Sequence, residues 1–213
     1  MKKITVIGSL NRDLVVKVAK LPKPGETVVV ESSSDFLGGK GANQAVAAAK
    51  MGAHVTMMGM IGDDNDGQLL IDSLKENHIL TNHIIKTQKS DTGLAIVSVE
   101  ESGENSVMVE AGANHQLDIE YIESNRQSLI ETDYILLQLE IPIEVVEYVI
   151  NVGKALNKFI ILNPAPASNL KDSIFNDIDI LTPNTSELAY LSGMKVENIN
   201  DVKAAALKMI NKG

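Results

Sequence analysis

The chain has 213 residues, of which 44% are hydrophobic and 22% are charged, and this composition fits one globular domain or a domain with a small appendage. Its net charge of −9 argues against non-specific nucleic-acid binding, which requires a basic face. The absence of cysteine excludes disulfides and thiolate metal sites.

The first residues bear on the cellular compartment. Met1–Lys3 lead directly into Ile4–Ile7, and no apolar stretch is long enough for a signal peptide or a membrane span. We therefore expect a cytoplasmic soluble protein that binds neither nucleic acid nor a membrane.

The first apolar run predicts a short buried strand that ends at Gly8 and Ser9, as in doubly wound α/β sheets. Ligands of such sheets collect at the C-terminal ends of the strands. Asn11 and Asp13 arrive at that end. Both are also common turn residues, so their position alone does not separate a binding role from turn chemistry.

Two pairs of short β-branched runs predict a small antiparallel sheet. Within each pair no helix separates the runs, which span 14–18, 26–31, 92–100 and 106–110. The sheet would arise from insertions at about 12–35 and 91–111. Only one of its faces could rest on the main domain, so the other must meet water or a second subunit.

Residues 37–52 begin as a loop with three glycines in four positions and continue as a helix of small residues that stops at Gly52. Lys40 and Asn43 lie where the loop becomes the helix, beside free backbone N–H groups that favour hydroxyls, phosphates or carboxylates. The alternative is a tight loop before a buried alanine-rich helix. Gly41 and Gln44 occupy positions that exclude a P-loop and a dinucleotide fingerprint, respectively.

The rest of the chain alternates between strand and helix patterns, which predicts a doubly wound, mostly parallel sheet flanked by helices. Strands are expected at 55–62, 134–139, 159–162 and 178–181, and helices at about 66–77, 118–130, 143–156, 184–191 and 200–212. Asp66 is the expected N-cap of the first of these helices.

Further polar residues follow the later strands, namely Glu140, Asn163 and Asn184. Such groups can hydrogen-bond a polyol, whose hydroxyls both donate and accept. Asn184 precedes Glu187 by three residues at a helix start, so the pair could hold a hydrated Mg²⁺ beside a phosphate. Alternatively, Glu187 only complements the helix dipole, an effect worth about 0.3–1 kcal/mol.

The segment Gly38–Ala45 resembles the first signature of ribokinases, within the phosphofructokinase-B-type sugar kinases. The other matching segments follow in the family's order: Ser9–Asp13, Pro24–Thr27, Gln138–Pro142, Leu162–Ala167 and Thr182–Glu187. The resemblance covers the whole chain. Its lysine-containing Gly-Gly-Lys-Gly-Ala-Asn form favours ribose or a near relative over the substrates of fructokinases and nucleoside kinases.

The resemblance implies ATP-dependent phosphorylation of D-ribose to ribose 5-phosphate, with Mg²⁺ and a monovalent cation such as K⁺. It implies a set of sugar-binding residues, which are Asn11, Asp13, Gly38, Gly39, Lys40, Asn43 and Glu140. Asn184 and Glu187 would serve the ATP phosphates, with Glu187 reaching Mg²⁺ through water. The small sheet would be a lid over ribose and would pair two subunits into a homodimer.

One part of the family pattern has no counterpart in these 213 residues. The family's Gly-Ala-Gly-Asp-type segment forms an anion hole and supplies the general-base Asp. The resemblance therefore implies a base beyond residue 213, and we expect the 213-residue chain by itself to be inactive. Two alternatives stay open, a kinase for another furanose such as deoxyribose and a non-catalytic sugar-binding fragment.

Overall fold

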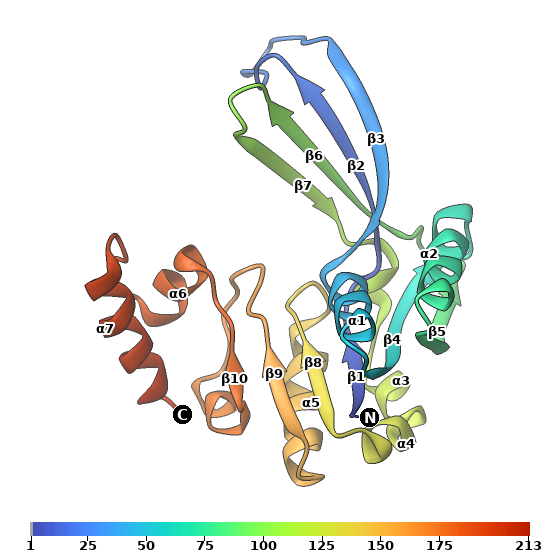
Figure 1. Cartoon of the computed structure of the whole chain (residues 1–213), viewed down its shortest axis with the longest axis vertical. Coiled ribbons are helices and arrows are strands. Elements are labelled where there is room, and N and C mark those ends of the chain that lie inside the picture. The colour runs from blue at the N-terminus through green and yellow to red at the C-terminus, as the bar shows by residue number, and fades with distance from the viewer. Residues whose placement is uncertain (1) are drawn as a thin grey trace.

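The computed structural model describes residues 2–213 and contains a large parallel sheet and a smaller second sheet (Figure 1). The strand order of the large sheet is β10-β9-β8-β1-β4-β5, and all its pairs are parallel. Its strands are β1 (Lys3–Ile7), β4 (His54–Gly62), β5 (Leu80–Thr87), β8 (Tyr134–Leu137), β9 (Phe159–Leu162) and β10 (Ile180–Leu181). The predicted doubly wound sheet is confirmed.

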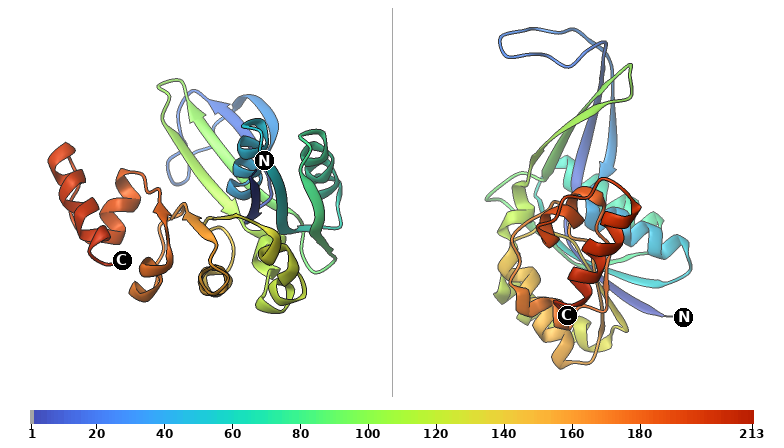
Figure 2. Two further views of the ribbon diagram at one scale, coloured as in Figure 1. Left: turned by 60° about the horizontal axis from the view of Figure 1, so that its bottom comes forward. Right: turned by 90° about the vertical axis from the view of Figure 1, so that its left-hand side faces the viewer.

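Helices cover both faces of this sheet, which makes a three-layer body (Figure 2). On one face lie α1 (Lys40–Lys50) and α2 (Asn65–Glu76), and on the other lie α3 (Ile119–Ser124), α4 (Arg126–Glu131) and α5 (Ile143–Ala155). Beyond β10, α6 (Thr185–Ser192) packs against α7 (Ile199–Ile210). Two 3₁₀ helices complete the fold, η1 (Gly112–Gln116) and η2 (Asp172–Asp177).

Strand geometry explains why the core strands are continuous apolar runs. Successive side chains of a strand point to opposite faces, and here both faces are covered. Val6 and Met57 pack in the α1 and α2 layer, whereas Ile7 and Met58 pack on the opposite side, and all four are fully buried. No helix among residues 2–213 is long and apolar enough to cross a membrane.

The N-cap of α2 differs from the prediction. The helix begins at Asn65, and the side chain that caps it belongs to Asp64, whose Oδ1 accepts from the Gly67 backbone N at 2.7 Å. Asp66 lies inside the first turn. The prediction fails because several capping residues follow one another here, and only the backbone conformation selects among them.

The second sheet projects beyond the C-terminal edge of the large sheet (Figure 1). Its order is β3-β2-β6-β7, with β2 (Asn11–Val18), β3 (Val30–Gly38), β6 (Gly93–Glu100) and β7 (Asn105–Glu110). The prediction of a purely antiparallel sheet is wrong, since β2 and β6 pair in parallel. Both strands leave the same edge of the large sheet, after β1 and β5, so they run outward in the same direction.

Two further strand assignments change. The strand expected at 26–31 is replaced by β3, which starts at Val30 and continues to Gly38, at the edge of the glycine loop. The sequence does not predict β5, because polar residues such as Asn82, His83 and Lys86 interrupt its apolar pattern. β5 is an edge strand, and its polar side chains are compatible with that position.

Candidate functional site

The glycine loop packs directly on the chain that leaves β1. Gly39 has a φ of 88°, which favours glycine, and a Cβ there would lie 2.8 Å from both Asn11 N and Ser9 O. A Cβ on Gly41 would lie 2.7 Å from Ser9 N. The loop's glycines therefore permit a close approach between two backbone segments, and they bring Lys40 beside the residues that follow β1.

Glu140, after β8, is fixed against this loop. Its Oε2 accepts hydrogen bonds from Ser9 Oγ at 2.5 Å and from the Lys40 backbone N at 3.1 Å. Its Oε1 lies 3.7 Å from Lys40 Nζ. The side chain of Glu140 is only 14% exposed, so the carboxylate is held in one place, between the end of β1 and the start of α1.

Asp13 is one of three residues, with Ser90 and Gln138, that keep a buried side-chain polar atom without a hydrogen-bond partner among residues 2–213. It lies on β2, and the atom concerned is its Oδ1. Burial and then the Glu140 carboxylate raise the pKa of Asp13, against a smaller opposing effect of Lys40. Gly38 lies directly beside it, since a Cβ there would be 2.5 Å from Asp13 Cγ. An unpaired buried oxygen costs free energy that a donor on a ligand would recover.

The remaining sugar-site candidates differ in burial. Asn11 is 3% exposed, and its Oδ1 accepts from Asn114 Nδ2 at 2.8 Å. Asn43 is exposed on the first turn of α1, where its backbone N donates to Gly39 O at 2.9 Å. The structure thus places the predicted residues from β2, the glycine loop, α1 and the end of β8 around one edge of the large sheet.

Sequence reasoning assigned no role to three buried polar residues here, Ser9, Asn114 and Gln138. Ser9 and Gln138 belong to matched motifs, which was the only signal for them. Gln138 donates to Gln44 Oε1 at 2.6 Å and keeps a buried Oε1 without a partner. Asn114 lies in η1, where no periodic pattern draws attention to it.

Asn184 and Glu187 form a reciprocal capping box at the start of α6. Glu187 N donates to Asn184 Oδ1, while Glu187 Oε2 accepts from Asn184 N and Oε1 accepts from Asn184 Nδ2, each at 2.8 Å. Glu187 is 8% exposed. The pair therefore lies at a helix start, as the sequence predicts, and both residues take part in capping it. β10 lies three strands from β1, so the C-terminal ends of these two strands are separated by roughly 14 Å across the sheet.

The acidic residues do not make an all-protein metal cage. Among residues 2–213 there is no group of three or more His, Cys, Asp or Glu side chains that could hold an ion. A hydrated Mg²⁺ that relies on substrate phosphates needs only one or two carboxylates, so the residues present fit that kind of ion alone.

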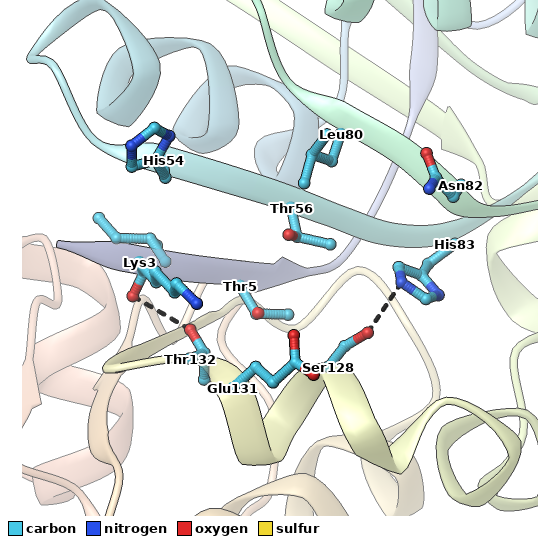
Figure 3. Close-up of a pocket in the computed structure, with 11 residues that line it drawn as sticks. Lys3, Thr5, His54, Thr56, Leu80, Asn82, His83, Ser128, Glu131 and Thr132 are labelled. Atoms are coloured by element: carbon cyan, nitrogen blue, oxygen red, sulfur yellow. Dashed lines mark hydrogen bonds between the residues drawn. The ribbon is translucent and has the colours of Figure 1, made fainter. Parts of the chain in front are cut away.

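A polar pocket of about 420 Å³ lies at the opposite end of the strands, between the first halves of β1, β4 and β5 and helix α4 (Figure 3). Two histidines, His54 and His83, line it, and the His83 ring is held on both sides, with Nδ1 2.7 Å from Asn125 Oδ1 and Nε2 2.8 Å from Ser128 Oγ. Thr132 Oγ1 donates to Lys3 O at 3.1 Å. None of the predicted site residues lines this pocket.

Comparison with known proteins agrees with the arrangement. The model of the pfkB family of carbohydrate kinases matches residues 1–213. Ribokinase from Haemophilus influenzae is 38% identical over all of this chain and 69% of its own length, and deoxyribokinase from Salmonella typhimurium is 37% identical over 99% and 69%.

The structure of Arabidopsis thaliana ribokinase complexed with ribose and ATP superposes with a TM-score of 0.87 at 29% identity, over all of this chain and 69% of the other. The chain thus spans about two thirds of the relatives named here, and 40% of a bifunctional ribokinase/ribose-5-phosphate isomerase A from Fructilactobacillus sanfranciscensis. The family match over the whole chain, joined to the glycine loop and the strand-end residues, shows that this chain belongs to the pfkB family of carbohydrate kinases.

Proposed function

We propose that this chain forms the sugar-binding part of an ATP-dependent ribokinase, which converts D-ribose into ribose 5-phosphate. The observation that carries the proposal is the unpaired, buried Asp13 carboxylate oxygen beside the glycine loop. A carboxylate accepts and never donates when ionised, so it selects ligand hydroxyl groups. Ribokinase relatives at 38% and 41% identity support ribose as that ligand.

Sugar hydroxyls need both donors and acceptors. Asp13 and Glu140 supply acceptors, while the Lys40 ammonium and the amide groups of Asn11 and Asn43 supply donors. Gly38 and Gly39 have no side chains, so a sugar ring can approach the backbone of the loop closely. Deoxyribose is the second candidate, because a deoxyribokinase is as similar to this chain as several ribokinases are.

The phosphate end of the site would be Asn184 and Glu187, with ATP as co-substrate. Each Glu187 oxygen accepts one hydrogen bond from Asn184, and a carboxylate offers about four acceptor positions, so both oxygens can also accept from water. Glu187 would thereby reach a hydrated Mg²⁺. That ion would neutralise charge on the phosphate that is transferred. We also propose that the enzyme uses a monovalent cation such as K⁺.

We propose that the second sheet acts as a lid over the sugar and pairs two subunits. The face that carries Asp13 has two charged residues, Asp13 and Lys17, and seven apolar ones, which are Val15, Phe36, Ala95, Val97, Val99, Val107 and Val109. The other face has a similar number of apolar residues but four charged ones, Arg12, Asp35, Glu100 and Glu110, so charge is what separates the two faces. Val107 and Val109 are each 52% exposed, so a second subunit on the Asp13 face would remove apolar surface from water.

Register makes the pairing testable with two matched variants. Val97 pairs with Val15, and Val16 pairs with Ser98, so Val97 and Val16 point to opposite faces. Val97→Lys should convert the dimer to monomer in sedimentation velocity, whereas Val16→Lys should leave it dimeric. A wild-type protein that sediments only as a monomer would refute pairing through the lid.

The activity itself is tested on the full-length protein with ribose, 2-deoxyribose and ATP. Calorimetry should show ribose binding, and a coupled assay should show ADP and pentose 5-phosphate formed in equal amounts. Tighter binding and faster turnover of 2-deoxyribose would select the second candidate. Ribose binding without phosphoryl transfer would indicate a sugar-binding protein, and no binding of either pentose would reject the proposal.

A further inference from the structure

Asn114 occupies a buried position where the lid joins the body. It lies in η1, just after β7, and is 1% exposed. Its Oδ1 accepts from Leu10 N at 2.9 Å. Its Nδ2 lies 2.8 Å from Asn11 Oδ1, 2.9 Å from Ala111 O and 3.2 Å from Leu10 O. A backbone N–H cannot accept, so these partners permit a single orientation of the Asn114 amide.

This orientation determines how Asn11 is presented. Asn11 Oδ1 is occupied by the Asn114 amino group, so the amino group of Asn11 is directed away from Asn114. Side chains alternate along a strand, so Asn11 and Asp13 share one face of β2. Asn11 is thus set as a donor on the face where Asp13 is an acceptor.

The contact between the two amides depends on a neighbouring glycine. Gly93, at the start of β6, pairs with Asn11 in the sheet. A Cβ on Gly93 would overlap both Asn11 Oδ1 and Asn114 Nδ2. The two amides contact each other in the space that a Gly93 side chain would fill. The start of β2, the start of β6 and η1 therefore meet at this hydrogen bond, at the base of the lid.

We propose that Asn114 is a positioning residue of the sugar site, which fixes the Asn11 amide with its amino group toward the sugar. Asn114 also joins both ends of the lid, because Leu10 precedes β2 and Asn11 begins it, while Ala111 follows β7. The inference rests on the proposed function, since it assigns Asn114 a part in ribose binding.

The decisive variant is Asn114→Asp. A carboxylate still accepts from Leu10 N, but it cannot donate to Asn11. The Asn11 amide is then expected to turn so that its amino group bonds the new carboxylate, which leaves an acceptor where the sugar needs a donor. Ribose Kd, measured by calorimetry on the full-length protein, should rise tenfold or more.

A control with a half-buried asparagine separates positioning from the general effect of an Asn→Asp change. Asn77, at the end of α2, donates its Nδ2 to Ser73 O at 2.8 Å, away from the site. Asn77→Asp should change ribose Kd less than twofold. If circular dichroism shows that Asn114→Asp does not fold, Asn114→Ser replaces it. Serine brings no charge, but its short side chain cannot bond Leu10 and Asn11 at the same time. We expect ribose Kd to rise at least threefold in Asn114→Ser.

A double-mutant cycle tests whether Asn114 acts through Asn11. On an Asn11→Ala background, Asn114→Asp should change ribose Kd less than twofold. An equal effect on both backgrounds, or an unchanged Kd in the single variant, would overturn the inference.

A wild-type protein that does not bind ribose would reject the proposed function instead. The amide orientation is then tested without sugar, by exchange of the Asn11 side-chain NH₂ in NMR spectra. This exchange should be slower in Asn114→Asp than in wild type, and equal rates would overturn the inference.

Discussion

The two ends of the site use similar residues in opposite ways. At the sugar end, an asparagine and an aspartate follow β1, and the Asp13 carboxylate keeps a buried oxygen without a partner. At the phosphate end, an asparagine and a glutamate follow β10, and both oxygens of Glu187 accept from Asn184. Buried polar atoms are nearly always paired, so the unpaired oxygen is the more informative sign of a ligand.

The difference has a cost for the protein without its ligand. Burial and the neighbouring Glu140 raise the pKa of Asp13, which means that the ionised form is destabilised in the fold. Glu187, in contrast, completes the start of α6 by bonds within the chain. Under the proposed assignment, the sugar end trades stability for binding, while the phosphate end is stabilised by bonds within the chain.

The largest expected effect follows from removing the Asp13 charge. Asp13→Asn should weaken ribose binding by roughly 1–3 kcal/mol, because the amide has no charge and replaces one of the two acceptor oxygens by an NH₂ donor. The same change should leave the free energy of unfolding equal or higher, because the unpaired buried carboxylate is gone. Calorimetry and urea unfolding measure the two quantities.

The control for this variant is Asp63→Asn. Asp63 is 49% exposed in its side chain and lies 3.7 Å from Lys86 Nζ, far from the glycine loop along the chain. Both quantities should stay near their wild-type values in Asp63→Asn. Asp13→Asn with unchanged ribose affinity would remove Asp13 from the site.

The second effect is a dependence of ribose affinity on pH. The folded-state pKa of Asp13 lies above its ordinary value of 3.8. Ribose affinity should therefore fall as the pH drops from neutral through this raised pKa, approaching tenfold per pH unit below it. The free protein should show the reverse sign, since the stability that protonated Asp13 contributes is present below pH 3.8 and is lost as the pH rises through the folded pKa.

Asp13→Asn isolates this titration from that of the other carboxylates. In the variant, the part of the pH dependence that belongs to Asp13 should disappear from calorimetric titrations between pH 4 and 7. An identical pH profile in both proteins would assign the dependence to another group.

Much of the candidate site could be singled out from sequence because strand ends and glycine loops have local signatures. Glu140 follows an apolar run, and Lys40 stands between glycines, so both were found from patterns alone. Asn114 was not, because its importance comes from contacts with Leu10 and Asn11, which lie more than a hundred residues away in sequence. The role proposed for Asn114 follows from its contacts in space and not from its residue type.

The same limit applies to the fold. The runs that form β2 and β6 were recognised, but their parallel pairing was not, because it depends on where each strand leaves the large sheet. β5 was missed because alternating polar residues weaken the signal of an edge strand. The sequence favoured Asp66 over Asp64 as the N-cap of α2. Several residues in a row can cap a helix here, and the sequence does not show which of them has the extended backbone of an N-cap.

The smallest expected effect decides what Glu187 does beyond capping. Helix α7 offers a matched control, since Asn198 and Asp201 form the same reciprocal box. If both acids only cap, Glu187→Gln and Asp201→Asn should each lower the free energy of unfolding by about 0.3–1 kcal/mol, since the amide can still accept from the N-cap but no longer complements the helix dipole, and turnover should stay intact. If Glu187 also reaches Mg²⁺ through water, its variant alone should lose roughly tenfold in turnover and need more Mg²⁺ for half-maximal rate, since losing such an outer-shell partner typically costs about 10–100-fold. Ribose affinity should stay constant in both variants, because the sugar residues lie on other strand ends. A magnesium titration in which the two variants coincide would leave Glu187 as a helix cap.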